Sequence, residues 1–283
     1  MEVLEGECHP ELECQSSSGV GIEIVDKSLF VKFLGFPATL IHGDTLIMDR
    51  WFWLKNNLPK SKQMERLIDI GCGTGAFSIG AALRGYDVLG LSWDERNQRV
   101  AGERAEICNA KTAKFDVLDV RRLDSRDDLA INFDVAICLE VIEHIINDNK
   151  LIIDITTCLK PGGRLLLTTP YFFCHPITCC DKGPFSKIED GSHVRRGYTK
   201  DMLEEICGQA NLKIKSISYC SGFLSQKITY IQRKISKVHP LVAWVAILPF
   251  RLLPPLFDRI VTSLLRWPFY SICLEAYKPR CTY

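Results

Sequence analysis

A cluster of glycines is the part of the sequence that points most directly to ligand chemistry. Gly71, Gly73 and Gly75 follow the apolar segment ERLIDI and precede the small, apolar segment AFSIGAAL. Glycines at a turn from strand to helix let the backbone approach a ligand closely, and the first N–H groups of the helix are unpaired. The spacing is GxGxG with Asp69 two residues before the first glycine, whereas a dinucleotide-binding turn has GxGxxG. The cluster therefore predicts a nucleotide-like ligand other than a dinucleotide.

These glycines lie within a regular alternation of apolar runs and amphipathic stretches that begins at residue 66. Such an alternation is typical of α/β folds, in which strand and helix units wind around a parallel sheet. We expect strands at 66–70, 87–91, 113–117, 133–139, 163–169, 212–220 and 269–277. We expect helices at 75–84, 94–109, 120–129 and 147–159, the first ended by Gly85 and the last by Pro161-Gly162-Gly163.

Two segments fall outside this alternation and set the expected domain boundaries. Residues 1–60 form an N-terminal tail, mobile over about the first twenty residues, and a cap helix at 44–58 that lies against the sheet. Residues 61–222 form the core. Residues 223–268 form a helical insertion between the last two strands, and residues 269–283 hold the last strand and a tail.

Composition and charge limit the classes of partner and location. Hydrophobic residues make up 47% of the 283 residues and charged residues 24%, which is typical of a globular chain with ample core material. A net charge of +1 without a basic stripe predicts no nucleic-acid partner. The N-terminus is acidic and no apolar run reaches 18 residues, so we expect neither export nor a membrane span, and a cytoplasmic location.

The thirteen cysteines are scattered singly, and several lie inside apolar runs. We interpret them as reduced packing residues, in keeping with a reducing compartment. A zinc site at Cys8 and Cys14, or at Cys174, Cys179 and Cys180, is the less favoured interpretation, because structural zinc uses closely spaced pairs.

Three motifs in order resemble those of the class I S-adenosylmethionine-dependent methyltransferases. They read DIGCGTG at 69–75, FDVAICLEVIEHI at 133–145 and LKPGGRLLLTTP at 159–170. The resemblance is clear from Glu65 to Pro170 and weaker toward the C-terminus. It implies a Rossmann-like, seven-stranded, mostly parallel sheet with helices on both faces, and S-adenosylmethionine as cofactor.

The same resemblance implies which residues bind the cofactor. They are Asp69, Gly71, Cys72, Gly73, Gly75, Ser92, Trp93, Asp94, Asp119, Val120 and Leu139. Ser92 stands where the family usually has an acid that bonds the ribose, and it either contacts the ribose or caps the following helix, in which case Asp94 reaches the ribose. Asp119 matches the acid held against the adenine amino group, with helix capping as the alternative.

Methyl transfer from a sulfonium is an in-line displacement, so positioning and exclusion of water supply most of the catalysis. A hydroxyl or protonated amine acceptor must also lose a proton. Glu143 and His144 lie where the family places the acceptor, and His193 is a second candidate base, so these three are the expected catalytic residues. A structural hydrogen bond is the alternative role for each histidine.

Glu140, Glu143 and His144 form the pattern ExxEH, which resembles the metal motif of small-RNA 2′-O-methyltransferases and of ubiquinone-pathway O-methyltransferases. If this turn is helical, the three side chains share one face and suit a divalent ion. Metal-free relatives carry the same letters, so we expect no metal and rank these residues as low-priority ligands.

The insertion suggests what kind of acceptor the chain takes. Its sequence is apolar, is interrupted by prolines and contains scattered basic residues, which predicts two or three short helices. These helices would cover an apolar acceptor pocket, pair two subunits or lie in a membrane interface. Trp244, Ile247, Leu248 and Phe250 are suited to burying an apolar acceptor. We therefore predict a methyltransferase for a bulky apolar or amphipathic small molecule, such as a secondary metabolite, isoprenoid or lipid-linked compound. A metal-assisted O-methyltransferase and a noncatalytic cofactor-binding scaffold are the alternatives.

Overall fold

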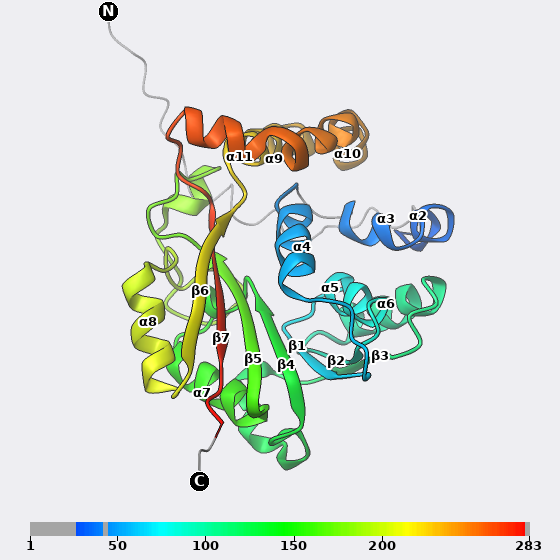
Figure 1. Ribbon diagram of the computed structural model, residues 1–283. Coiled ribbons are helices and arrows are strands. Elements are labelled where there is room, and N and C mark those ends of the chain that lie inside the picture. The colour runs from blue at the N-terminus through cyan, green and yellow to red at the C-terminus, as the bar shows by residue number, and fades with distance from the viewer. Residues whose placement is uncertain (1–26, 42–44, 281–283) are drawn as a thin grey trace, which may run out of the picture.

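The computed structural model describes residues 27–41 and 45–280, which contain a seven-stranded sheet (Figure 1). The strands are β1 (Arg66–Ile70), β2 (Asp87–Ser92), β3 (Ala113–Val117), β4 (Phe133–Leu139), β5 (Leu159–Pro170), β6 (Lys213–Cys220) and β7 (Ser271–Tyr277). Their order is β3-β2-β1-β4-β5-β7-β6, parallel except for β7, which is antiparallel to both neighbours. The expected α/β class and mostly parallel Rossmann-like sheet are confirmed.

Helices cover both faces of the sheet, which explains why its central strands are continuous apolar runs. On one face lie α4 (Thr45–Asn57), α5 (Ala76–Ala82) and α6 (Glu95–Ile107), and on the other lie α7 (Asp148–Cys158) and α8 (Lys200–Gln209). Each face has its own apolar core, with Trp51 and Ile79 in the first and Ile155 and Leu203 in the second. The predicted cap helix at 44–58 corresponds to α4.

Side-chain caps fix the start of α6, α7 and α8, whereas α5 begins at Gly75 without one. The Asp94 carboxylate accepts hydrogen bonds from the N–H groups of Arg96 and Asn97 and so begins α6. Asn147 and Thr199 cap α7 and α8 in the same way. The interpretation of Ser92 as this helix cap is therefore wrong, because Ser92 is the last residue of β2 and the cap is Asp94.

Two local expectations differ from the structure. Residues 120–129 form two 3₁₀ segments, Val120–Ser125 (η2) and Asp127–Leu129 (η3), instead of one α-helix. Arg126 has a non-helical backbone there, and its side chain pairs with Asp116 and Asp128. The second difference is that Pro161-Gly162-Gly163 does not end α7, which stops at Cys158, but lies inside β5, where the register with β4 shifts.

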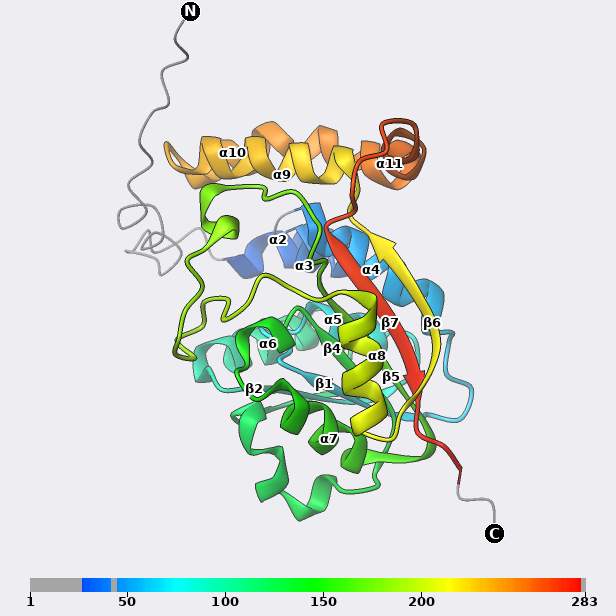
Figure 2. The same ribbon diagram turned by 90° about the vertical axis from the view of Figure 1, so that its left-hand side faces the viewer.

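The insertion consists of α9 (Phe223–Ser236), α10 (Pro240–Ile247), the 3₁₀ segment η6 (Leu248–Leu252) and α11 (Leu253–Leu264). Figures 1 and 2 show it as one helical layer at the end of the molecule where β6 ends and β7 begins. It contacts the N-terminal helix α2 (Lys27–Leu34) through the rings of Phe30 and Trp244, whose centroids are 4.9 Å apart. It contacts α3 (Phe36–Ile41) because Trp244 Nε1 and Arg251 Nη1 both donate to the Ile41 carbonyl, at 2.9 and 2.8 Å.

Some expectations fall on parts of the chain that the structure leaves out. The N-terminal tail, with Cys8 and Cys14, and the side chains of Cys179 and Cys180 lie outside the described residues. Cysteines that the structure describes are free thiols, and most of them are buried. Among the described residues, no helix combines the length and the apolar character needed to cross a bilayer.

Candidate active site

The glycine cluster forms the turn between β1 and α5. Gly71, Gly73 and Gly75 all have positive φ, at 76°, 52° and 78°, a backbone region that L side chains rarely adopt. A Cβ on Gly71 would meet Val141 Cγ2 at 2.6 Å, and one on Gly75 would meet Phe115 at 2.9 Å. A Cβ on Gly73 would meet nothing within 4 Å. The turn is therefore closely packed at Gly71 and Gly75 and open at Gly73, which fits a ligand that contacts the backbone.

Two predicted cofactor residues at this turn are buried and already paired. The Ser78 hydroxyl donates to Asp69 Oδ2 at 2.5 Å, and burial raises the pKa of Asp69 to about 7. Burial also raises the pKa of the Cys72 thiol, which keeps it protonated, and Cys72 Sγ lies 3.4 Å from Gln98 Oε1. These two side chains order the turn through α5 and α6.

The residues predicted for the nucleoside line the carboxyl ends of β2, β3 and β4. Ser92 is buried at the end of β2, whereas Trp93 is 70% exposed and presents its ring to solvent. Val120 and Leu139 are buried apolar residues that follow β3 and end β4. The carboxyl edge of parallel strands is where α/β sheets bind ligands, and these residues meet there.

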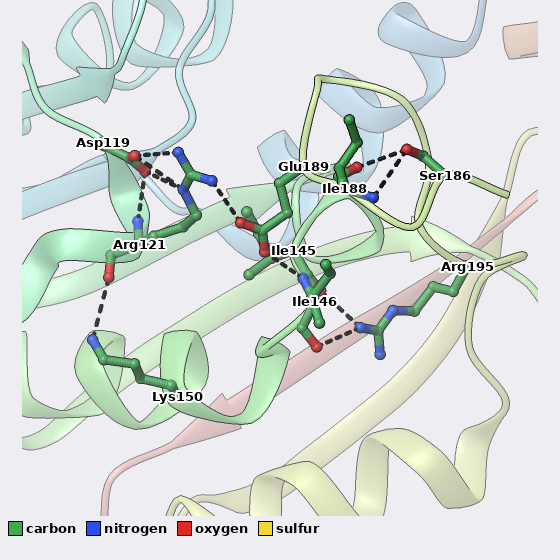
Figure 3. A network of polar contacts seen from close by, with 9 residues as sticks. All are labelled: Asp119, Arg121, Ile145, Ile146, Lys150, Ser186, Ile188, Glu189 and Arg195. Carbon is green, nitrogen blue, oxygen red and sulfur yellow. Dashed lines mark hydrogen bonds and ion pairs between the residues drawn. The ribbon is translucent and has the colours of Figure 1, made fainter.

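Asp119 belongs to a network of ion pairs that joins three segments (Figure 3). Its carboxylate accepts from the Arg121 N–H and guanidinium, and this hydrogen bonding lowers the pKa of Asp119. Arg121 also pairs with Glu189 at 2.6 Å, and Glu189 accepts from the Ile146 N–H at 2.6 Å. Asp119 thus caps η2, as the alternative interpretation held, and the network ties the loop between β5 and α8 to the segment after β4.

The three predicted catalytic residues lie together at the end of β4. Glu143 and His144 are in the 3₁₀ turn Ile142–His144 (η4), and His193 comes from the loop before α8. The two imidazole centroids are 4.6 Å apart, and His144 Nε2 lies 4.0 Å from Glu143 Oε1. A backbone bond from Val194 N–H to the Glu143 carbonyl, 2.9 Å, holds the His193 loop in place. One ligand atom from each of the three residues lies within 4.8 Å of the others.

The electrostatics of this cluster follow from burial. Glu143 is fully buried, and burial, reinforced by Glu140, raises its pKa well above the usual range. Burial lowers the pKa of His193 to about 4, and His144 acts in the same direction. Thr169 donates to Glu143 Oε2 at 3.1 Å, but Glu143 Oε1 and His144 Nδ1 have no hydrogen-bond partner in the described part of the chain. Buried polar atoms without partners are costly, which makes this cluster a candidate ligand site.

Glu140 does not join this cluster, which corrects the expectation of one helical ExxEH face. Its backbone is left-handed (φ 55°), and the helical turn begins only at Ile142. Arg50 of α4 takes the Glu140 carboxylate at 2.9 Å, and Ser271 donates to its other oxygen at 3.1 Å. Glu140 therefore joins α4 to the sheet.

Sequence reasoning missed several residues that support the site. Gln98 of α6 donates to the carbonyls of Gly90 and Asp116, and Arg104 donates to Thr74 Oγ1 of the glycine turn at 2.7 Å. Both are buried on a helix face that otherwise reads as amphipathic. A glutamine and an arginine at core-facing spacing were the only signal available. Glu189 lies in a loop and gave none.

A family model described as a methyltransferase domain matches residues 50–217. Among curated proteins, the ubiquinone biosynthesis O-methyltransferase of Dechloromonas aromatica is 32% identical over 106 residues, covering 37% of this chain and 44% of that protein. The Acinetobacter baumannii (strain AYE) protein of the same name is 30% identical over 105 residues, covering 37% and 44%. The chain thus matches less than half the length of these relatives.

Solved structures share the fold at low identity. The Haemonchus contortus phosphoethanolamine N-methyltransferase 2 aligns with a TM-score of 0.58 and 19% identity, covering 91% of this chain and 61% of that one. The geranyl diphosphate C-methyltransferase of Streptomyces coelicolor A3(2) aligns with a TM-score of 0.53 and 15% identity, covering 81% and 77%. With the family model spanning more than half of the sequence, the chain belongs to the methyltransferase domain family and is of the expected class I, S-adenosylmethionine-dependent type.

Proposed function

We propose that this chain transfers the methyl group of S-adenosylmethionine to a hydroxyl group of a bulky apolar or amphipathic small molecule. The cofactor supplies an electrophilic methyl group on a sulfonium. The open backbone at Gly73 would hold its amino acid part, and Ser92 and Trp93 would hold its nucleoside. A solved relative is described in complex with S-adenosyl-L-methionine and another with S-adenosyl-L-homocysteine, which supports this cofactor.

The observation that carries the proposal is the set of partnerless buried atoms at the end of β4. Within the described residues, Glu143 Oε1 and His144 Nδ1 are buried and unbonded, and the His193 ring packs against His144. A hydroxyl acceptor would bond these atoms, and its proton would pass to a histidine nitrogen as the new carbon–oxygen bond forms. The histidines would act as acceptors of that proton, and Glu143 would orient the hydroxyl.

An aromatic cluster where β5 and β6 end and β7 begins supports an apolar acceptor. Tyr171 follows β5, Tyr219 lies near the end of β6 and Phe269 precedes β7, so all three meet at one edge of the sheet. Ring centroids lie 5.1 Å apart for Tyr171 and Tyr219, and 6.3 Å apart for Tyr219 and Phe269. Of the insertion residues predicted for the acceptor, Ile247 is buried in the helical layer and Phe250 is 51% exposed, so neither supports a closed roof.

Variants of the cluster test the proposal through label transfer. We expect Glu143→Leu, which removes the polar group, and His193→Gln to lower the transfer of labelled methyl into an organic-solvent extract of cells about 100-fold or more. The affinity for S-adenosylmethionine, measured by calorimetry, should stay within about twofold of the wild-type value, because neither residue is placed against the donor. His175→Gln is the matched control, since His175 is an exposed histidine on the same loop. Unchanged transfer in both cluster variants would overturn the assignment of these residues.

A second candidate function is metal-assisted O-methylation, which the 4.8 Å grouping of Glu143, His144 and His193 favours. One carboxylate oxygen and two imidazole nitrogens fit a divalent first-row ion, which would supply Lewis-acid polarisation of the hydroxyl. The primary proposal expects label transfer to survive EDTA. Loss of transfer with EDTA, restored by Mg²⁺ or Mn²⁺, together with weaker Mn²⁺ binding by His144→Gln in calorimetry, would establish the second candidate instead.

A further inference from the structure

The helix α11 buries its polar side and exposes its apolar side, which is the reverse of an ordinary surface helix. Its buried residues are Pro254, Asp258 and Thr262, spaced four apart. Asp258 accepts from the N–H groups of Gly222 and Leu224, at 2.6 and 2.7 Å, so the polar side of α11 faces α9. An amphipathic helix normally buries its apolar side against the protein.

The opposite side of α11 is apolar and exposed. Its large residues recur at helical spacing and include Leu256 (67% exposed), Ile260 (60%) and Leu264 (79%). The same helix also exposes Leu253 and Phe257, and the neighbouring segments expose Val238, Val242, Val245, Phe250, Leu252 and Leu265. Soluble monomers rarely expose so many large apolar side chains together, and such surfaces mark interaction sites. We call these residues of 238–265 the apolar surface.

The charge of the insertion identifies what this surface meets. Residues 223–268 contain the basic residues Lys227, Arg233, Lys234, Lys237, Arg251, Arg259 and Arg266. Asp258 is the only acidic residue in this range, and it is buried against α9. The segment therefore carries a large positive excess in a chain whose net charge is only +1. Lys227, Lys234, Lys237, Arg259 and Arg266 are exposed.

We propose that the insertion docks on an anionic lipid bilayer, with the apolar surface in the headgroup region and the exposed cations at the lipid phosphates. Exposed apolar residues flanked by lysine and arginine are the features of helices that lie in a membrane interface. No helix among the described residues can span the bilayer, which leaves docking at its surface. Figures 1 and 2 show the insertion as a layer at one end of the molecule, so that α11 lies on the outside.

A second copy of the chain is the less favoured occupant. A two-fold contact through the apolar surface would place two strongly basic segments against each other, and the repulsion would oppose pairing. An anionic bilayer attracts the same charges. The proposal does not depend on methyl transfer, because it rests only on the exposure and charge of the insertion.

Vesicle flotation with the full chain tests the proposal. We expect binding to phosphatidylcholine vesicles that contain phosphatidylserine, little binding to phosphatidylcholine alone, and weaker binding as salt rises. The double variant Leu256→Ser/Ile260→Ser should bind about tenfold more weakly or worse, because it removes two exposed apolar side chains that the headgroup region would bury. Leu83→Ser/Ile153→Ser is the matched control, since both residues are exposed apolar positions elsewhere.

A charge-reversal pair tests the electrostatic half. Lys234→Glu/Arg259→Glu should reduce binding to the anionic vesicles about tenfold or more, whereas Lys60→Glu/Lys62→Glu should change it less than about twofold. Absence of binding to both vesicle types would overturn the proposal. So would a dimer in sedimentation velocity that Leu256→Ser/Ile260→Ser dissociates, and so would equal binding to both vesicle types without salt dependence.

Discussion

The cofactor half and the acceptor half of the site differ in how many of their buried polar atoms have hydrogen-bond partners. Around the glycine turn, Asp69 bonds Ser78, Gln98 bonds two carbonyls and Arg104 bonds Thr74. On α4, η4 and α9, which we assign to the acceptor half, the described residues include buried polar atoms with no partner, such as Asp49 Oδ2, Glu143 Oε1 and Thr229 Oγ1. Apart from Arg104 Nε, the buried side chains that we name around the glycine turn have their partners within the described residues.

This difference indicates which part of the site determines specificity for the acceptor. Fully bonded groups hold a turn rigidly whatever acceptor is used, so a shared cofactor can be served by similar residues across a family. Partnerless buried groups cost free energy until something bonds them, and they therefore record the polarity of a particular ligand. We infer that the donor site is generic and that the acceptor side is particular to this chain.

The largest expected effect is on stability, at Asp49. Burial raises the pKa of Asp49 to about 7, helped by Asp258 and opposed by Arg50 and the hydroxyls of Ser221 and Ser225. The folded chain thus holds this proton up to about pH 7 while the unfolded chain loses it near pH 4. The free energy of unfolding therefore falls as pH rises from 4 to 7, by an amount on the order of 3 kcal/mol from this group.

The variant Asp49→Asn removes that titration. We expect it to match the wild type in urea unfolding at pH 4 and to exceed it in unfolding free energy by about 3 kcal/mol at pH 8. Asp128→Asn is the control, because Asp128 is an exposed carboxylate paired with Arg126. A difference between Asp49→Asn and wild type that does not grow with pH would show that the acceptor side is as well satisfied as the donor side.

The next effect concerns the donor site. Gly73→Val should weaken S-adenosylmethionine binding about 100-fold or more, equivalent to about 2.7 kcal/mol, because a side chain would occupy the open space beside the backbone. Gly35→Val is the matched control: Gly35 also has positive φ (64°) and open space around its Cβ, but it lies between α2 and α3. Calorimetry with both folded variants separates blocked binding from backbone strain. Equal losses in the two would argue against a donor site at Gly73.

The smallest effect is the change in unfolding free energy when either of two buried threonines is replaced by valine. Thr229 Oγ1 has no partner among the described residues, whereas the Thr156 hydroxyl donates to the Ile152 carbonyl at 2.8 Å. Thr229→Val should leave stability unchanged or raise it by up to about 1 kcal/mol, and Thr156→Val should lower it by about 1 kcal/mol. Thermal unfolding of the two variants, without acceptor, measures the contrast. Equal destabilisation would mean that Thr229 is bonded within the chain.

The sequence predicted best those parts that local physics decides. Strands such as 66–70 and 133–139 were found at the right residues, because burial on both faces makes them continuous apolar runs. The glycine turn was visible for the same reason, since only glycine adopts its backbone readily. His193 was expected only as a second candidate base, and its place beside His144 is a contact between distant segments that no local pattern predicts.

Long-range pairing explains what the sequence could not predict. Arg50 lies 90 residues from Glu140, and their ion pair decides that Glu140 leaves the ExxEH group. Arg126 breaks the expected helix at 120–129 through its pairs with Asp116 and Asp128. The orientation of α11 depends on Asp258 bonding the start of α9, which the spacing of apolar residues alone would reverse.

The central claim is that the donor half and the acceptor half together methylate an apolar hydroxyl compound. The most direct measurement is mass spectrometry of a cell extract that was prepared with organic solvent and then incubated with the chain and methyl-labelled S-adenosylmethionine. We predict one apolar compound that gains a labelled methyl group on oxygen, and none with His193→Gln. The contrary result would be that the wild type binds S-adenosylmethionine in calorimetry but labels no compound, even with Mg²⁺ or Mn²⁺ present. The chain would then be a cofactor-binding scaffold without methyl transfer.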